Sequence, residues 1–276
     1  MTQVSSGPEE PLAGGIANLG EVVRVGDTVR RPASAFTDAI FALFEHLHAV
    51  GFDGVPQPLG RDERGREVLS FVEGDVPIPP FPAWSMTDQA LASVARLHRR
   101  FHEAAATFDA SRFAWSDELA DPRGGIVVGH NDICPENVVF RDGEAVAFLD
   151  WDFAAPGRPL WDVAAVMSMW GPVHDPSDPV PGMEGLDPFA RARVIADAYG
   201  LGADQRAAIP DVFVERLSIS LVETRAAKGE QAFIEMLERQ GGAGRAERRR
   251  RWLADNMDAL RSAMVEAGVS RGRRAA

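Results

Sequence analysis

The stretch VVGHNDICPENVVF, from Val127 to Phe140, places a short polar segment between two apolar runs. The polar residues include His130, Asp132 and Asn137, and a proline between the last two interrupts any helix. Asp and Asn are common in turns for reasons of backbone geometry alone. Their spacing, with the apolar runs on either side, predicts a functional loop between two buried strands.

A second stretch, AFLDWDFAAPG at 147–157, begins soon afterwards, and its apolar run ends at Asp150. Residues 138–140 and 145–149 are expected to pair as a hairpin through the turn sequence RDGE. Because Asn137 and Asp150 flank the two ends of this hairpin, we expect their side chains to lie close together.

These residue types suit phosphoryl transfer. A carboxylate and an amide oxygen are hard ligands that suit Mg²⁺ bound partly through substrate phosphates. A further carboxylate upstream, that of Asp132, can accept the proton of a substrate hydroxyl.

The segment HNDICPEN resembles the catalytic loop of protein kinases, with the same separations. The surrounding sequence resembles the aminoglycoside phosphotransferase and choline kinase-like family more closely, over roughly residues 14–230. GHNDICPENVVF, FLDWDFAAPG and PLWDVA follow one another in that family's order. The activation-loop signature of protein kinases, A-P-E, does not follow Asp150.

The resemblance implies an α+β, two-lobed protein kinase-like fold. It has a small antiparallel-sheet lobe with one helix and a larger helical lobe. It also implies a role for each residue of the block. Asp132 would be the base and His130 would brace the catalytic loop, while Asn137 and Asp150 would bind Mg²⁺.

Two further aspartates belong to the same block. Asp152 would be a second metal ligand, although the strand ends at Asp150. Asp162, in LWDVA, would support the catalytic loop by hydrogen bonds from the following helix.

The co-substrate implied by the resemblance is ATP or GTP. In the N-terminal lobe, Gly14 and Gly15 would cover the phosphates, and backbone groups of the segment Ser70, Phe71 and Val72 would face the base. The sequence match for the glycines is weak, since no G-x-G-x-x-G pattern is present.

The phosphate-binding cation departs from the family pattern. The only lysine of the chain is Lys228, so either an arginine stands where the family has an N-lobe lysine or the role is unfilled. We favour Arg30 over Arg31, with Glu45 of the following helix as its ion-pair partner. Arginine binds phosphate in a bidentate manner and is not equivalent to lysine.

Composition bounds these expectations. The chain has 276 residues, 45% hydrophobic, and a net charge of −12, which disfavours nucleic acid as a partner. It has one cysteine, no recognisable signal peptide and no apolar run long enough for a membrane span. We therefore expect a cytoplasmic protein, a monomer or homodimer without a membrane partner.

Local patterns predict the domain organisation. Residues 1–74 would form the nucleotide lobe, with a flexible lead over 1–13, joined by a proline-rich linker, 75–84, to a catalytic and substrate-binding lobe over 85–276. The predicted hairpins are 21–25 with 28–32, and one ending in 67–74. The predicted helices are 36–52, one starting at a capping box of Ser85 and Asp88, 159–170, 189–200, 204–228, 230–240 and 246–267.

The acceptor is expected to be a small molecule, and a cationic aminoglycoside or amino alcohol is one candidate; the alternative explanation of the charge pattern is a soluble acidic surface. Residues 75–185 carry 17 acidic and seven basic side chains, and acidic walls concentrate cations. The candidate contacts are Asp175, Asp178, Glu184 and Glu223.

Other interpretations stay open. The missing lysine favours a nucleotide-binding regulatory or immunity protein without transfer activity, whereas the complete catalytic loop favours an enzyme. A metal hydrolase has little support, because no paired-histidine zinc motif is present. His98 and His102, at helical i, i+4 spacing, are interpreted as core or surface residues.

Overall fold

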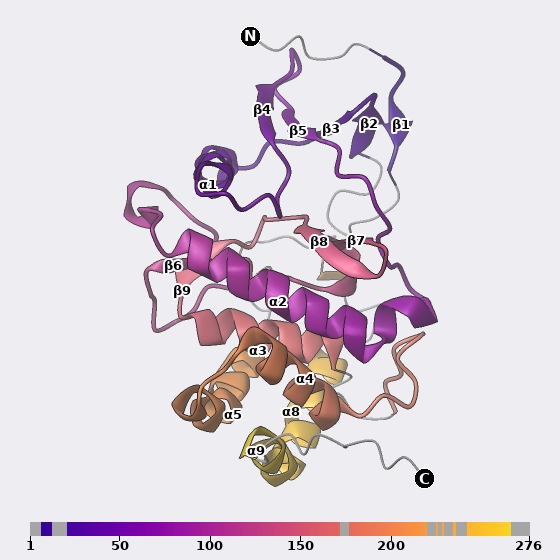
Figure 1. The fold of residues 1–276 in the computed structure, drawn as a ribbon, viewed down its shortest axis with the longest axis vertical. Helices are drawn as coiled ribbons and strands as arrows, with labels where there is room; N and C mark the ends of the chain where they lie inside the picture. The colour runs from indigo at the N-terminus through magenta and orange to yellow at the C-terminus, as the bar shows by residue number, and fades with distance from the viewer. Residues whose placement is uncertain are drawn as a thin grey trace, which may run out of the picture.

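The computed structural model describes residues 7–12, 21–171, 177–219, 225, 228, 234–235 and 242–265. A small sheet lobe sits above a larger, mainly helical lobe (Figure 1). The expected α+β, kinase-like architecture is therefore confirmed.

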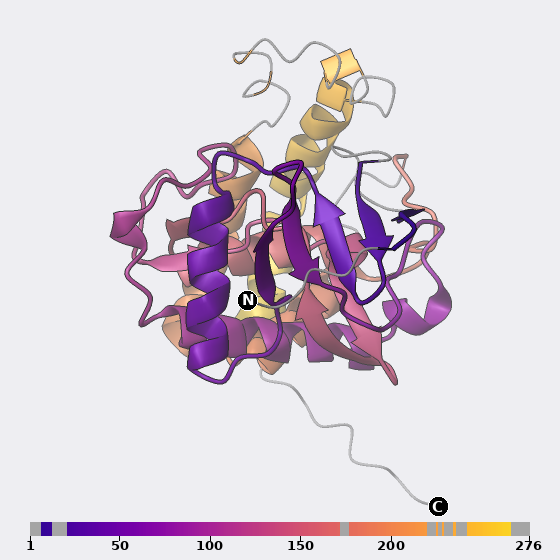
Figure 2. The same ribbon diagram turned by 90° about the horizontal axis from the view of Figure 1, so that it is seen from above.

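The upper lobe is a five-stranded antiparallel sheet in the order β1-β2-β3-β5-β4, accompanied by one helix. Its elements are β1 (Glu10–Pro11), β2 (Val23–Val25), β3 (Thr28–Arg31), α1 (Thr37–Ala49), β4 (Pro58–Arg61) and β5 (Glu67–Ser70). The predicted first hairpin is confirmed, with a tight turn at Gly26, whose φ is 58°. Helix α1 ends as predicted before Gly51, which takes a left-handed φ of 84°. Seen from above, α1 lies beside the β4 edge of the sheet (Figure 2).

A backbone bridge joins the linker to the lower lobe. Asp75 and Phe140 exchange two hydrogen bonds of 2.8 Å, which join the chain after β5 to a hairpin of the lower lobe. The predicted capping box is wrong. Thr87 is the N-cap, its side chain accepting from Ala90 N at 3.1 Å, while Ser85 lies in a preceding 3₁₀ turn.

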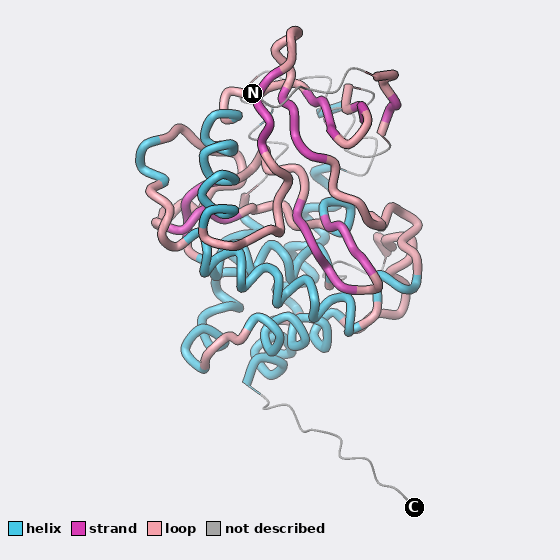
Figure 3. Tube along the Cα trace, turned by 45° about the horizontal axis from the view of Figure 1, so that its top comes forward, coloured by secondary structure: helices cyan, strands magenta, loops and turns pink. Residues whose placement is uncertain are grey.

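The lower lobe surrounds two central helices, α2 and α3, with the remaining helices packed below them (Figures 1 and 3). Its elements are η1 (Ala83–Met86), α2 (Asp88–Ala105), η2 (Ala110–Arg112), β6 (Val127–Gly129), η3 (Pro135–Asn137), β7 (Val138–Arg141), β8 (Glu144–Phe148), β9 (Ala155–Gly157), α3 (Pro159–Trp170), α4 (Pro188–Tyr199), α5 (Ala203–Ser218), α8 (Gly242–Asp255) and α9 (Met257–Val265). The predicted β7–β8 hairpin and the helices at α3 and α4 are confirmed.

The C-terminal helices differ from prediction. α5 ends at Ser218 because Ile219 is extended, ten residues before the predicted end. The predicted single helix over 246–267 is two helices, broken at Asn256, whose side chain donates to Trp252 O at 2.8 Å. The predicted helix 230–240 lies almost entirely outside the described residues.

One hydrophobic core runs beneath the loop from His130 to Asn137. Trp161, Trp170, Phe101 and Phe148 are at most 1% exposed, and they pack α2 and α3 against the β7–β8 hairpin. Among the described residues, no helix is both long enough and apolar enough to span a bilayer.

Candidate active site

A cavity of about 300 Å³ lies between the two lobes and takes its walls from both. The sheet contributes Arg31 and Glu67, while Asn137 and Asp150 come from the two ends of the β7–β8 hairpin, as the hairpin predicted. Most of the remaining wall is apolar. A cavity of this kind with a few convergent charged groups is the usual form of a ligand site.

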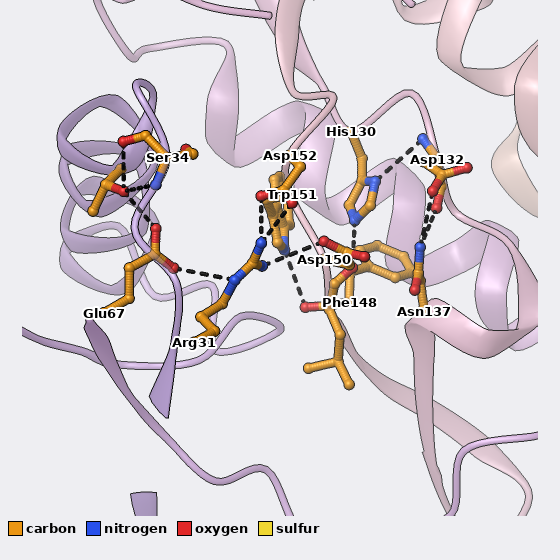
Figure 4. A network of polar contacts seen from close by, with 12 residues as sticks. Arg31, Ser34, Glu67, His130, Asp132, Asn137, Phe148, Asp150, Trp151 and Asp152 are labelled. Carbon is orange, nitrogen blue, oxygen red and sulfur yellow. Dashed lines mark hydrogen bonds and ion pairs between the residues drawn. The ribbon is translucent and has the colours of Figure 1, made fainter. Parts of the chain in front are cut away.

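The loop from His130 to Asn137 brings its polar side chains together (Figure 4). Asn137 Nδ2 donates to the backbone oxygen of Asp132 at 2.9 Å and to its carboxylate at 3.2 Å. Burial, followed by the negative charge of Asp150, raises the pKa of Asp132 to about 8, and Arg216 opposes that rise. With this pKa the carboxyl group changes its protonation state slightly above neutral pH.

His130 is fully buried and contacts the backbone on both sides. Its Nδ1 accepts from Asp132 N at 3.2 Å, and its Nε2 lies 2.8 Å from Leu149 O. This pattern assigns the proton to Nε2, and burial lowers the pKa of His130 to about 4. Because both ring nitrogens are engaged by backbone groups, the neutral ring fixes the loop and offers neither nitrogen to a substrate.

Asp162, near the start of α3, anchors the same loop. Its carboxylate accepts from the backbone N–H groups of His130 and Asn131, each at 2.8 Å. His98 and His102 of α2 contact the same carboxylate at 2.9 and 3.1 Å. Burial opposes ionisation of Asp162, yet the two histidines hold its pKa well below its ordinary value.

These contacts refine the interpretation of the two histidines. His98 and His102 are buried core residues, as expected, but their partner is a buried carboxylate that the sequence did not place beside them. Their role in the structure is to hold Asp162 beneath the loop.

Arg31, and not the favoured Arg30, lines the cavity. Alternate residues of β3 point to opposite faces of the sheet. Arg30 is 2% exposed and lies on the far face, where Nη1 donates to Thr28 Oγ1 and Nε is 4.0 Å from Asp62.

Arg31 is surrounded by three carboxylates (Figure 4). It binds both oxygens of Asp152, at 2.5 and 2.6 Å, and lies 3.3 Å from Asp150 and 3.4 Å from Glu67. Burial disfavours its charge, but the three acids together raise its pKa above the ordinary value. Glu67 of β5 is thus the partner of the arginine, and the expected partner, Glu45, is exposed on α1.

The donor set fits a divalent cation. Asn137 uses its amide nitrogen toward Asp132, which leaves its carbonyl oxygen for another partner, and both Asn137 and Asp150 line the cavity. Burial raises the pKa of Asp150, with Asp152 acting in the same direction. A cation would relieve this accumulation of negative charge.

The connecting segment after β5 contributes to the same cavity. Ser70, Phe71 and Val72 line it, as expected of residues that would face a nucleotide base. Gly14 and Gly15 lie outside the described residues.

The acidic residues expected to bind the acceptor are engaged elsewhere or lie outside the described residues. Asp178 accepts from Arg248 Nε at 2.7 Å, and Glu184 accepts from the backbone of Gly182 at 2.8 Å. Asp178 is therefore paired with a cation, whereas Glu184 is exposed and accepts only from a backbone N–H. Asp175 and Glu223 lie outside the described residues.

Comparisons with known proteins agree with this geometry. The model of the phosphotransferase enzyme family matches residues 105–195. The trifolitoxin immunity protein of Rhizobium leguminosarum bv. trifolii is 32% identical over 222 residues, covering 77% of this chain and 81% of that protein.

Solved structures resemble the chain over most of its length. A choline/ethanolamine kinase family protein from Mesorhizobium loti superposes with a TM-score of 0.62 at 18% identity, covering 95% of this chain and 94% of that one. The GDP complex of aminoglycoside 2'-phosphotransferase-IIIa gives 0.57 at 15% identity, covering 92% and 95%. The chain therefore belongs to the phosphotransferase enzyme family and has the protein kinase-like fold of these structures.

Proposed function

We propose that this chain is a phosphotransferase that moves the terminal phosphoryl group of ATP or GTP to a hydroxyl of a small molecule. The observation that carries the proposal is that Asn137 and Asp150 line a cavity between the lobes, while the carboxylate of Asp132 lies 3.2 Å from Asn137 Nδ2. In this proposal residues 1–74 hold the nucleotide, and residues 85–276 hold the acceptor.

In the reaction, Asp132 accepts the hydroxyl proton as the acceptor oxygen bonds to the γ-phosphorus. The bond from that phosphorus to the bridging oxygen breaks, and the nucleoside diphosphate leaves. Asn137 and Asp150 would hold Mg²⁺, which neutralises charge on the phosphate oxygens when bound. His130 and Asp162 keep the loop in place.

Arg31 is proposed as the phosphate-binding cation. Its guanidinium is held by Asp152 on one side and Glu67 on the other, so it is oriented at the cavity wall. A planar, permanently charged group of this kind suits bidentate contact with phosphate. In this assignment Asp152 has both oxygens committed to Arg31, which favours Asp150 over Asp152 as the metal ligand.

The test is a transfer assay with labelled ATP and GTP against a panel of hydroxyl acceptors. The panel includes cationic aminoglycosides, amino alcohols, neutral macrolides and trifolitoxin. Asp132→Ala should abolish transfer and leave nucleotide binding intact, whereas Asp150→Ala should also abolish Mg²⁺-dependent nucleotide binding. Normal turnover in either variant rejects the assignment.

A second function is favoured by a specific observation. The relative at 32% identity carries the name of an immunity protein, and Arg31 in place of lysine is bound to three acids. The alternative is a nucleotide-binding immunity protein that does not transfer phosphate. If Asp132→Ala still protects sensitive cells against trifolitoxin as well as the parent does, protection does not depend on transfer.

A further inference from the structure

Arg216, in the last turn of α5, is a buried cation directly behind the catalytic loop. It is 7% exposed, and its Nη2 donates to the backbone oxygen of Asn131 at 3.0 Å. Its guanidinium carbon lies 5.3 Å from the centre of the Trp161 ring. Burying a guanidinium costs several kcal/mol unless its surroundings compensate, so the position calls for a specific explanation.

The residue that Arg216 contacts has an unusual backbone. Asn131 has a φ of 65°, in the left-handed region, which costs about 1 kcal/mol for a residue other than glycine. The surrounding structure holds three polar groups of this residue. Its N–H donates to Asp162 at 2.8 Å, its side chain donates to Phe153 O at 3.0 Å, and its carbonyl oxygen accepts from Arg216.

The carbonyl of Asn131 belongs to the peptide group that leads into Asp132. Asp162 of α3 holds the loop by accepting from the N–H of Asn131. Arg216 of α5 holds it by donating to the carbonyl oxygen of Asn131. The N–H of that peptide donates to His130 Nδ1 at 3.2 Å, and Arg216 holds its carbonyl at 3.0 Å. Without the contact from Arg216 the carbonyl loses its restraint, and a tilt of the peptide changes the direction of the Asp132 side chain.

We propose that Arg216 is a positioning residue for phosphoryl transfer: it fixes the peptide that precedes Asp132 and so aims the carboxylate at the acceptor hydroxyl. This inference rests on the proposed function of Asp132. It assigns to α5, an element distant in sequence, a direct part in the geometry of the catalytic loop.

A second buried arginine provides a matched control. Arg191 of α4 is 2% exposed and also donates to backbone oxygens, those of Trp170 at 2.7 Å and Met86 at 2.8 Å. Both arginines retain one buried nitrogen without a hydrogen-bond partner in the described structure. They differ in what they hold, because the oxygens bound by Arg191 lie outside the catalytic loop.

The experiment compares Arg216→Met, Arg216→Lys and Arg191→Met in the full chain. Arg216→Met should lower kcat by about 100-fold, the scale expected when a catalytic group is misplaced by about 1 Å, while KM for the nucleotide stays within about twofold. Arg216→Lys keeps a charge and a donor, and it should recover about tenfold of the loss. Arg191→Met should lower the melting temperature without this selective loss of kcat.

Hydrogen exchange at the amides of residues 130–134 gives a readout that does not need activity. Exchange there should quicken in Arg216→Met and stay unchanged in Arg191→Met. If wild-type protein transfers phosphate to no acceptor, the proposed function fails, while this measurement still tests the positioning contact. Unchanged exchange in Arg216→Met, or equal losses of kcat in both methionine variants, overturns the inference.

Discussion

The surroundings of the Asp132 carboxyl group oppose its ionisation. The stability of the folded protein should therefore depend on pH in a way that the Asp132→Asn variant reveals. Its folded pKa of about 8 lies above the ordinary value of 3.8. A raised folded pKa contributes stability that is complete below pH ~4 and is lost as pH rises through about 8. Asp132→Asn removes this titration, so the variant should be more stable than the parent by on the order of 2 kcal/mol at pH 8.5.

Denaturant unfolding of the metal-free protein at pH 5, 6, 7 and 8.5 measures this difference. The advantage of the variant should grow steadily across the series. Asp255→Asn, at an exposed position of α8, is the control and should show no such trend. A constant difference between parent and Asp132→Asn would mean that the carboxyl group is ionised at every pH tested.

The two adjacent arginines of β3 allow an internally controlled test of the phosphate site. Arg31→Met should weaken binding of ATP or GTP by about 100-fold, because it removes the charge that faces the cavity. Arg30→Met should change nucleotide affinity by less than about twofold, since Arg30 lies on the opposite face of the sheet. Titration calorimetry with Mg²⁺ present measures both, and equal effects of the two variants would contradict the assignment of Arg31.

Among the elements, α2 and α3 support the loop from His130 to Asn137 through the carboxylate of Asp162. Asp162→Ala leaves two loop amides and two histidines without their acceptor. Removing one partner of such a buried network typically costs about 3–5 kcal/mol. We expect a loss of stability of that size, measured by the midpoint of thermal or denaturant unfolding.

The control for this change is Asp197→Ala in α4. Asp197 is half exposed and pairs with Arg206 at the surface, where an ion pair contributes at most about 1 kcal/mol. If the two alanine variants lose similar amounts of stability, the buried network does not carry the loop.

Local patterns in the sequence predicted most helices and strands, and they predicted that Asn137 and Asp150 lie close together. The turn between β7 and β8 was enough to bring Asn137 beside Asp150, because a hairpin joins its own ends. The choice between Arg30 and Arg31 was also within reach. Strict alternation along β3, with Thr28 and Arg30 buried together, puts Arg31 on the other face.

Contacts between distant segments were not predictable in this way. Glu67 reaches Arg31 across paired strands, and Arg216 reaches the catalytic loop from α5, 85 residues away in sequence. The helix and strand periodicity of the sequence indicates neither contact. The helix break at Asn256 was missed for a different reason. The side chain of Asn256 donates to the carbonyl oxygen of Trp252, and the apolar helical pattern around it does not indicate this bond.

At the scale of the whole molecule, arginine balances the acidic middle of the chain. Asp121 binds Arg158 at 2.6 Å, Glu118 binds Arg225 at 2.6 Å, and Asp178 binds Arg248. Arg158 belongs to residues 75–185 itself, whereas Arg225 and Arg248 come from later segments and partly neutralise the acidic excess counted in that stretch. Net charge in a stretch of sequence is therefore a poor guide to the charge of the acceptor.

The connection between the two lobes depends on the backbone at Gly74. Its φ is 146°, a conformation that side chains rarely adopt, and a Cβ placed there would lie 2.5 Å from Phe140 O and 2.6 Å from Val139 Cγ1. The next residue, Asp75, forms the backbone bridge to Phe140, and Gly74 itself lines the cavity between the lobes.

Gly74→Ala should therefore separate the linker from the β7–β8 hairpin. Strain and the steric clash together should destabilise the protein by about 2–4 kcal/mol, and displacement of the cavity wall should weaken nucleotide binding in the folded fraction. Gly65→Ala is the control, because its φ of 76° is also positive but its Cβ would meet nothing within 4 Å. That variant should lose only about 1–2 kcal/mol and keep full nucleotide affinity. Equal affinity in both variants would show that the bridge between the lobes is not needed to shape the nucleotide site.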